Sequence, residues 1–310
     1  MSLTSPHHLP SQYSLYVFNL GGPVADPNLA LGGAWFDSRV RQDKKNSAKY
    51  AESFYQGGLT LPNRDCYVNQ DAQTKRIRVA YQTYLVNVFK LLGEPPATAT
   101  AHAAAVQHLE RRLAKASKRP EDLRDPIANY HKLPVAQAAT QFPNLNLLLL
   151  LKTKGLGTAT DVMVGQPVFF QEVSTMLKVE PLADQKAYVR WHLVNSLTEA
   201  LPAAYGREQF ALQHVMRGAK IQKPRWKRML LSTDEALGEA FGQLYVDKIF
   251  LPEAKVRARQ MIENLRTAYA ERIKATCATG GPRRTANDST PALLWWANSS
   301  IPFRRWTRCT

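Results

Sequence analysis

Cysteine is scarce in this chain of 310 residues. Its three cysteines, Cys66, Cys277 and Cys309, are too few for a disulfide framework and form no C-x-x-C pair, so they do not indicate a redox compartment. Long apolar runs are also missing, because the stretch LNLLLLLK at residues 145–152 is too short to cross a bilayer. The first 20 residues lack a charged segment followed by an apolar run. The sequence therefore predicts neither a signal peptide nor a membrane anchor.

Acidic residues are also few, with 25 Asp and Glu against 41 Lys and Arg, which gives a net charge of +16. Such an excess raises nucleic acid or an anionic membrane surface as a partner. However, the basic residues are spread along predicted helices and lack the clustering and the interleaved aromatics of a nucleic-acid module. We therefore expect a solvated basic surface, and neither nucleic acid nor membrane is favoured as a partner. The length suits one large domain or two smaller ones.

Residues 223–274 carry the clearest periodicity and predict two long helices joined by a short break. Pro224 and Pro252 suit the first turns of these helices. Gly238 and Gly242 lie four residues apart, which suggests the close approach of another backbone. The sequence therefore predicts a core hairpin. Its apolar stripes consist of Trp226, Leu230, Leu237, Phe241, Leu244 and Tyr245, then Met261, Ile262, Leu265, Tyr269 and Ile273.

Upstream, helical spacing predicts helices over residues 71–92, 97–118 and 181–197, and a short helix over 210–217 that Gly218 ends. Residues 144–154 favour a buried helix over a strand, and residues 162–170 favour a buried β-segment. Residues 36–56 fit either an irregular strand pair or a short helix, and the pattern does not decide. Glu235 and Glu239, one helical turn apart, fit a solvent-facing or ion-paired strip better than a metal site.

Several short motifs follow one another along the chain. They are QGGLTLPNRDCY (residues 56–67), RVAYQTYLVNVFKLLG (78–93), LAKAS (113–117), RDP (124–126), QPVFF (166–170), YVRWHL (188–193), RWK (225–227), LGEAFGQLYV (237–246), EAK (253–255) and MIENL (261–265). In this order they resemble the neprilysin-like family of zinc metalloendopeptidases. The resemblance implies a structural role for the residues at the centre of these motifs. They are Gly58, Leu61, Pro62, Asp65, Arg124, Asp125, Pro126, Gln166, Pro167, Arg190, Trp191, Trp226, Gly238, Glu239, Gly242, Tyr245, Glu253 and Asn264.

The resemblance implies a mainly α fold with a few short strands. It would comprise the family's multi-helix cap domain and part of the helical scaffold that encloses peptide substrates. In the complete family enzyme, Zn²⁺ is bound by H-E-x-x-H on one helix together with a further carboxylate, and the Glu activates water. The family usually acts outside the cytoplasm. Peptides, and a separately encoded catalytic half, are the partners that the resemblance suggests.

The H-E-x-x-H signature is absent from this sequence. None of the seven histidines (His7, His8, His102, His108, His131, His192 and His214) stands in that motif. The sequence therefore predicts no catalytic residue and no metal ligand in this chain, and an inactive N-terminal portion of a metalloendopeptidase. The alternative is a stand-alone peptide-binding or interaction module without catalysis.

Three segments follow from the extent of the resemblance. Residues 1–35 match no family motif and are expected to be disordered, residues 36–275 form the family domain, and residues 276–310 form an unrelated tail. The tail is rich in Gly, Pro, Arg and Trp, and we interpret it as the product of a reading-frame shift near residue 275. A basic-aromatic interaction tail is the alternative.

Overall fold

The structure is a computed structural model that describes residues 34–278, and the expectations for the two ends of the chain lie outside these residues. The chain divides into two compact units between Ser232 and Thr233, and each is described by itself. Helices dominate both units, which confirms the mainly α fold class. Within the described part, no helix combines the length and the apolar character needed to cross a membrane.

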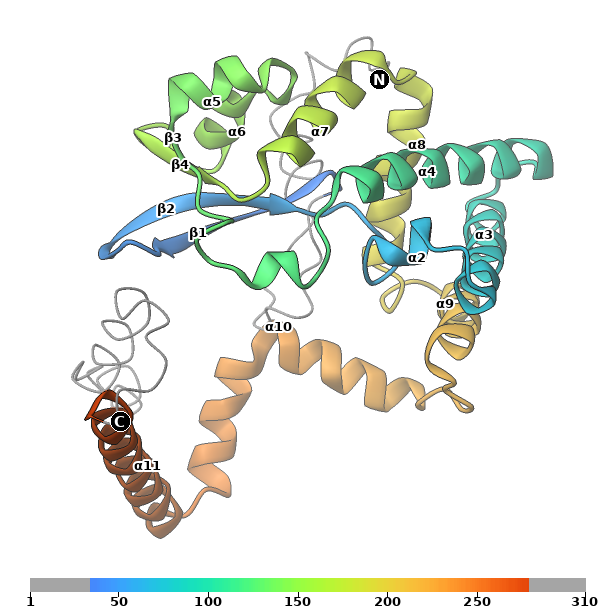
Figure 1. The fold of residues 1–310 in the computed structure, drawn as a ribbon. Helices are drawn as coiled ribbons and strands as arrows, with labels where there is room; N and C mark the ends of the chain where they lie inside the picture. Colours follow the sequence, from blue (N-terminus) through green and yellow to red (C-terminus); the bar gives the residue numbers. More distant parts are fainter. Residues whose placement is uncertain (1–33, 279–310) are drawn as a thin grey trace. The chain divides into compact units, whose positions relative to one another are not determined.

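The first unit contains a four-stranded mixed sheet with the strand order β1-β2-β4-β3 (Figure 1). Its strands are β1 (Phe36–Asp43), β2 (Asn46–Gln56), β3 (Lys132–Pro134) and β4 (Asp161–Val164). Strands β1 and β2 pair antiparallel as a hairpin, β2 and β4 pair parallel, and β3 and β4 pair antiparallel. The choice left open for residues 36–56 is thus settled as a strand pair. Its turn is stabilised by Asp43, whose carboxylate accepts a hydrogen bond from the Lys45 amide at 2.9 Å.

Eight α-helices and two 3-10 turns complete the described part of the first unit up to Arg217. They are α2 (Asp65–Val68), α3 (Ala72–Leu91), α4 (Pro96–Ala116), η2 (Asp122–Arg124), α5 (Val135–Gln141), η3 (Pro143–Leu145), α6 (Leu147–Thr153), α7 (Pro167–Val179), α8 (Leu182–Ser196) and α9 (Ala203–Arg217). The predicted helices at 71–92, 97–118, 144–154 and 181–197 are confirmed as α3, α4, α6 and α8. Asp71 caps α3 by accepting a hydrogen bond from Thr74 N at 2.8 Å.

Two sequence predictions need correction. The β-segment predicted over residues 162–170 ends at Val164, because Pro167 lacks a ladder N–H and instead occupies the first turn of α7. The short helix predicted over 210–217 begins seven residues earlier, at Ala203 after Pro202. Gly218 does end it, with a φ of 68°.

Aromatic side chains hold the first unit together. Phe170 of α7 lies against the sheet, with its ring centroid 5.2 Å from that of Phe36 and 6.2 Å from that of Phe54. In the helical part, where α3 contacts both α4 and α9, Trp191 of α8 packs edge-on against Tyr81 and Tyr84 of α3 (Figure 1). Trp191 is fully buried and belongs to the core.

Gly58 marks the closest approach between the segment that follows β2 and the start of the described chain. Its φ of 71° lies in the left-handed region, and a β-carbon there would lie 2.7 Å from Ala34 O and 2.9 Å from Trp35 O. The Tyr188 hydroxyl donates to Gly58 O at 2.8 Å and also to Ala34 O. Both the backbone conformation and the lack of space therefore require glycine at this position.

Gly58→Ala is expected to destabilise the first unit more than Gly155→Ala. Gly155 has nearly the same φ, 73°, but a β-carbon at that position would meet nothing within 4 Å. The control substitution should cost about 1–2 kcal/mol for left-handed strain alone, and Gly58→Ala roughly 1–3 kcal/mol more for overpacking. Urea unfolding followed by circular dichroism measures both, and equal costs would contradict the steric argument.

An ion-pair cluster links α4 to the end of α7. The Arg112 guanidinium donates to Glu172 Oε1 at 2.8 Å and also to Glu180, whose carboxylate lies 3.1 Å from His108 Nε2. Burial opposes ionisation of Glu180, but the hydrogen bonds and positive charges of Arg112 and His108 outweigh it and lower the pKa of Glu180. The cluster therefore stabilises the fold while Glu180 is ionised.

We expect the free energy of unfolding to fall as the pH drops through the lowered pKa of Glu180. The folded state then binds fewer protons than the unfolded state, whose glutamates titrate near about pH 4.3. Glu180→Gln should lower the stability at neutral pH and flatten its decline between about pH 6 and pH 3. The exposed Glu121, varied to Gln, is the control. An unchanged slope in Glu180→Gln would show that the cluster does not contribute.

The described part of the second unit belongs to two consecutive helices, α10 (Arg225–Lys248) and α11 (Pro252–Ala278), which are joined by residues 249–251 and are called the hairpin below. Both helices were predicted, but their predicted place in the core is wrong for the described residues. No residue of α10 is buried, and Phe241, Leu244 and Tyr245 are about half exposed, at 45%, 57% and 53%. The periodic stripe identified an amphipathic face correctly, but it did not show what covers that face.

The glycine pair of α10 has no backbone against it. A β-carbon at Gly242 would meet nothing within 4 Å, and one at Gly238 would meet only the Asp234 side chain at 3.5 Å. The helix bends beside them instead, because Leu237 has non-helical angles (φ −129°, ψ 17°).

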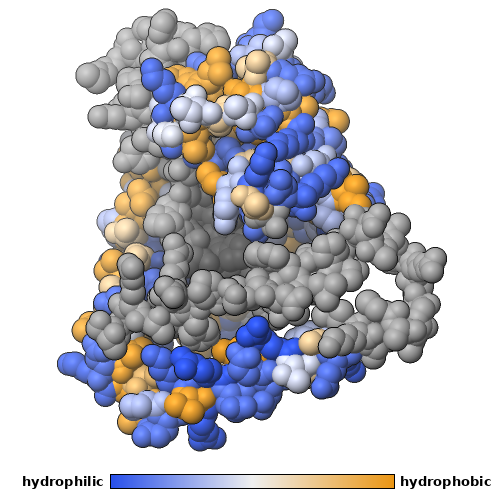
Figure 2. Space-filling model, turned by 90° about the vertical axis from the view of Figure 1, so that its left-hand side faces the viewer, coloured by the Kyte–Doolittle hydropathy of each residue, from blue (hydrophilic) through white to orange (hydrophobic). Residues whose placement is uncertain are grey.

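Apolar side chains lie open between charged ones on the surface of the molecule (Figure 2).

Candidate binding site

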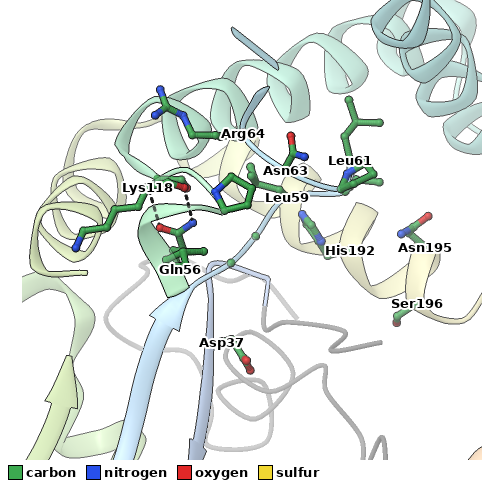
Figure 3. A pocket seen from close by; sticks show the side chains of 17 residues that line it. Asp37, Gln56, Leu59, Leu61, Asn63, Arg64, Lys118, His192, Asn195 and Ser196 are labelled. Carbon is green, nitrogen blue, oxygen red and sulfur yellow. Dashed lines mark hydrogen bonds between the residues drawn. The ribbon is translucent and has the colours of Figure 1, made fainter. Parts of the chain in front are cut away.

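A pocket of about 480 Å³ lies in the first unit, alongside the segment that follows β2. Figure 3 shows this segment crossing the pocket, with Gln56 and Lys118 on one side and His192, Asn195 and Ser196 of α8 on the other. The lining residues are Asp37, Gln56, Gly57, Gly58, Leu59, Thr60, Leu61, Pro62, Asn63, Arg64, Ser117, Lys118, Pro120, Leu123, His192, Asn195 and Ser196.

The start of this segment is fixed by side-chain amides. The Gln56 side chain accepts from Lys118 N at 2.7 Å and donates to Lys118 O at 3.0 Å. The backbone N–H of Gln56 donates to the buried Gln166 side chain at 2.9 Å, and Gln166 in turn donates to Asn129 at 3.1 Å. Three segments that are far apart in the sequence are thereby held beside the pocket.

The loop after η2 is shaped by the RDP motif. Asp125 accepts from the backbone amides of Ile127 and Ala128 at 2.8 and 3.0 Å, and these hydrogen bonds lower the pKa of Asp125. The buried Asn129 side chain donates to Asp122 O and Asp125 O at 2.8 and 2.7 Å. The loop therefore presents Asn129 to Gln166 in a fixed orientation.

The middle of the segment is anchored on a buried carboxylate. Glu110 of α4 is fully buried, and its Oε1 accepts from the backbone amide and the hydroxyl of Thr60 at 3.2 and 2.6 Å. Its Oε2 accepts from the hydroxyls of Tyr67 and Tyr81 at 2.9 and 2.7 Å. Burial, followed by the nearby charge of Glu110, raises the pKa of both tyrosines well above the usual value, so both remain donors.

Trp191 and Tyr67 extend this network to the backbone. The Trp191 indole N–H donates to the Thr60 hydroxyl at 2.9 Å, and the Tyr67 hydroxyl accepts from Leu61 N at 2.9 Å. Every polar group of Thr60 that faces the interior is thus satisfied, as a buried network requires.

Two nitrogen atoms of the pocket lining are buried without a hydrogen-bond partner. They are Nε2 of His192 and Nε of Arg64. His192 Nε2 lies 3.5 Å from Glu110 Oε1, too far for a hydrogen bond, and its ring stacks edge-on to Tyr188 at 4.5 Å. An unsatisfied buried polar group costs about 1–3 kcal/mol, so it usually marks a site that water or a ligand completes.

The charges that line the pocket are not balanced. The carboxylate of Asp37 is paired with Arg39 at 3.3 Å, and the Lys118 ammonium is hydrogen-bonded to Asn129 at 3.0 Å and Ala128 O at 3.2 Å. The Nε of Arg64 is buried without a hydrogen-bond partner among residues 34–278. The pocket therefore offers donors and positive charge in excess.

Zinc does not fit the described residues. No group of three or more His, Cys, Asp or Glu side chains within residues 34–278 is placed to hold a metal ion. His102 and His108 of α4 are engaged with Glu94 at 2.8 Å and Glu180 at 3.1 Å. Glu235 and Glu239 lie exposed on α10. We therefore derive no chemistry at a metal from this part of the chain.

The structure divides the predicted motif residues into two sets. The first set surrounds the pocket: Gly58, Leu61 and Pro62 line it, and Trp191, Gln166 and Asp125 support its walls through the contacts above. The other members of this set lie nearby in sequence. Asp65 begins α2, Arg124 and Pro126 flank Asp125 at the surface, Pro167 begins α7, and Arg190 pairs with Glu94.

The second set lies on the helical hairpin and takes no part in the pocket. Its members are Trp226, Gly238, Glu239, Gly242 and Tyr245 of α10 and Glu253 and Asn264 of α11. Trp226 is 63% exposed and carries Lys227 over its ring at 5.2 Å. These residues all lie on the hairpin, and their side chains have no chemistry in common.

Sequence reasoning missed Glu110, Gln56 and Asn129 and gave His192 no role. Glu110 had a usable signal, because it stands four residues after Val106 and three before Leu113, at helical spacing from apolar residues. A charged residue at such a position is buried only when partners compensate it. Gln56 and Asn129 had no such signal, since their partners lie far away in the sequence.

The fold of this chain is similar to that of solved structures. Zinc metalloprotease Zmp1 of Mycobacterium tuberculosis, solved with an inhibitor, superposes with a TM-score of 0.73 at 25% identity over 86% of this chain and 39% of that chain. PepO of Lactobacillus rhamnosis superposes with a TM-score of 0.67 at 16% identity, over 88% of this chain and 42% of that one, which supports the fold alone.

The sequence profile described as Peptidase family M13 matches residues 19–277, and the chain therefore belongs to this family, as its N-terminal region. Neprilysin-3 of Drosophila melanogaster is 29% identical over 245 residues, which cover 76% of this chain and 31% of that protein. Endothelin-converting enzyme 1 of Homo sapiens is 27% identical, over 77% of this chain and 32% of that protein. The chain thus spans about a third of the length of these relatives, and the family resemblance noted from the motifs is confirmed.

Glu110→Ala is expected to destabilise the first unit, because it leaves the buried hydroxyls of Thr60, Tyr67 and Tyr81 without an acceptor, at about 1–3 kcal/mol for each unsatisfied donor. Glu110→Gln keeps the shape of the side chain and should cost less. The matched control is Glu121→Ala, at an exposed position without a side-chain cap hydrogen bond. Urea unfolding measures the differences, and a cost for Glu110→Ala within about 0.5 kcal/mol of the control would exclude this network as an anchor.

Proposed function

We propose that this chain is the non-catalytic, substrate-enclosing portion of a zinc-dependent metalloendopeptidase that acts on peptides. The observation that carries the proposal is the extent of the match. Residues 19–277 belong to peptidase family M13, yet the chain covers only 31% of Neprilysin-3 and contains no H-E-x-x-H. The name of Zmp1, a zinc metalloprotease, supports zinc as the metal of the complete enzyme.

The zinc ion of a metallopeptidase polarises the scissile carbonyl and activates water. The described residues of this chain would contribute none of that chemistry, because they hold no suitable set of ligands. In the proposal, the described residues instead form part of the wall that encloses the peptide substrate. The Glu110 network and the Gln56–Gln166–Asn129 contacts fix rigid segments that can position a peptide and exclude solvent.

The exposed apolar face of the hairpin supports the proposal that another protein surface packs against it. Leu244, Met261 and Leu265 are 57%, 59% and 52% exposed, and many further apolar residues of α10 and α11 are similarly open (Figure 2). Monomeric proteins seldom expose so much apolar surface. We propose that the catalytic portion of the enzyme covers this face, whether it is part of the same protein or separately encoded.

Peptide binding without catalysis is the second candidate function. It is favoured by the pocket, in which the buried Nε of Arg64 and Nε2 of His192 lack partners. The two candidates differ in one respect that can be tested. Only the first requires that the hairpin face be covered by a catalytic portion.

The purified chain is expected to hydrolyse no fluorogenic peptide, with or without added Zn²⁺, and to self-associate through the hairpin. Leu244→Glu combined with Leu265→Glu should shift it towards monomer in light scattering. Val79→Glu, at a residue of α3 that is 66% exposed, should leave the association unchanged. Hydrolysis by the chain alone that chelation abolishes would overturn the non-catalytic assignment. A monomer with a wild-type hairpin would contradict the need for a cover.

A further inference from the structure

We propose that residues 39–50 of the strand pair β1–β2, called the basic ribbon below, bind a linear sulfated polysaccharide. The ribbon has one acidic residue, Asp43. Its five basic residues are Arg39, Arg41, Lys44, Lys45 and Lys49. The inference does not depend on the proposed function, because the ribbon contains no residue of the pocket lining or of the hairpin.

The acidic side chains in and beside the ribbon are already engaged. Asp43 is buried, and its carboxylate pairs with Lys132 at 3.1 Å. Asp37, which precedes the ribbon, pairs with Arg39 at 3.3 Å. Glu52, which follows it, is buried in an ion pair of its own. None of these three carboxylates therefore neutralises the remaining basic side chains of the ribbon.

Four basic side chains of the ribbon have no carboxylate partner among residues 34–278. They belong to Arg41, Lys44, Lys45 and Lys49, and all four residues are exposed. Partial desolvation, followed by the charge of Arg41, lowers the pKa of Lys44, although the charge of Asp125 acts in the opposite direction. Like charges are therefore crowded on the ribbon, and a bound polyanion would relieve their repulsion.

The ribbon presents its charges along a line. The register of β4 with β2 covers Glu52, Ser53 and Phe54, and the ribbon extends beyond this part of the sheet (Figure 1). A strand advances by about 3.3 Å per residue, so the four steps from Arg39 to Asp43 span about 13 Å. A linear polymer with repeated anionic groups matches such a row better than one compact anion does.

Two of the cations are held in place by aromatic rings. The Arg41 guanidinium lies 4.9 Å from the centroid of the Tyr55 ring, and Lys45 Nζ lies 4.5 Å from that of Tyr130. Each contact leaves the charge available to an anion but occupies a face of the ring. Single-stranded nucleic acid binds by stacking its bases on open aromatic rings, so Tyr55 and Tyr130 favour a polyanion without bases.

The exposed apolar side chains of the ribbon lie on the face opposite Arg41. Arg41 pairs with Ala51 in the strand register, whereas Tyr50 pairs with Gln42 and shares the other face with Val40. Val40 is 52% exposed and Tyr50 is 70% exposed. A membrane in contact with Arg41 would leave both side chains in water, although apolar burial stabilises binding to a membrane surface. A sulfated polysaccharide needs the charge alone.

The test uses the full chain and isothermal titration calorimetry with a heparin octasaccharide, before and after chemical removal of its sulfate groups. The sulfated form should bind, and more weakly as the salt concentration rises, because salt screens exposed charges. The ribbon variant carries Arg41→Gln, Lys44→Gln, Lys45→Gln and Lys49→Gln. Desulfation and the ribbon variant should each weaken binding by at least about tenfold.

The matched control changes four exposed basic residues of α3 and α4 to glutamine, namely Lys75, Arg76, Arg111 and Lys115. This control lowers the net charge by the same amount and should bind the octasaccharide as the wild type does. Lys44→Gln combined with Lys49→Gln keeps the cation–π contacts of Arg41 and Lys45 and should lose part of the affinity. Thermal unfolding by circular dichroism checks that each variant is folded.

Three results overturn the proposal. The first is no binding of the sulfated octasaccharide, or equal binding of the desulfated form. The second is equal weakening in the ribbon variant and in the matched control, which would assign binding to the overall charge. The third is tighter binding of duplex DNA, or of vesicles of phosphatidylcholine with phosphatidylserine, than of the octasaccharide. All three leave the non-catalytic assignment untouched, because that assignment is tested by hydrolysis and by the oligomeric state.

Discussion

The first unit depends on the burial of one carboxylate. Glu110 is fully enclosed, and an ionised group removed from water is tolerated only where hydrogen-bond donors replace its hydration. Those donors come from the segment after β2, from the turn at α2 and from α3, with His192 of α8 nearby. The same interactions that satisfy Glu110 therefore set the positions of three parts of the chain relative to α4. The wall of the pocket is rigid as a consequence of this requirement.

The spacing of apolar residues was sufficient to predict most helices, because a helix depends on residues that are only a few positions apart. The helix over residues 71–92 was predicted from the spacing of its apolar residues alone. The Glu110 network was not predicted, because its donors lie 29, 43 and 50 residues away and no local rule links them. The pocket could not be predicted for the same reason, since its lining comes from β1, from the segment after β2, from the end of α4 and from α8.

For the hairpin, sequence reasoning predicted the helices and their apolar faces but not the exposure of those faces. Its apolar stripes were read correctly, but a stripe reports only that a helix has two kinds of face. The conclusion that the face lies in a core assumed a partner surface, and residues 34–278 do not supply one. Gly242 illustrates the point, because its missing side chain leaves space that no neighbouring atom fills within 4 Å.

The two sets of motif residues therefore have different physical explanations. Gly58, Gln166 and Asp125 are explained within the first unit, since a close approach or a hydrogen bond accounts for each of them. Trp226 and Tyr245 have no such explanation, because both side chains are exposed, and a β-carbon at Gly242 would meet nothing within 4 Å. A cover over the hairpin face, as proposed above, would account for these residues. The chain itself spans about a third of the length of the relatives it matches.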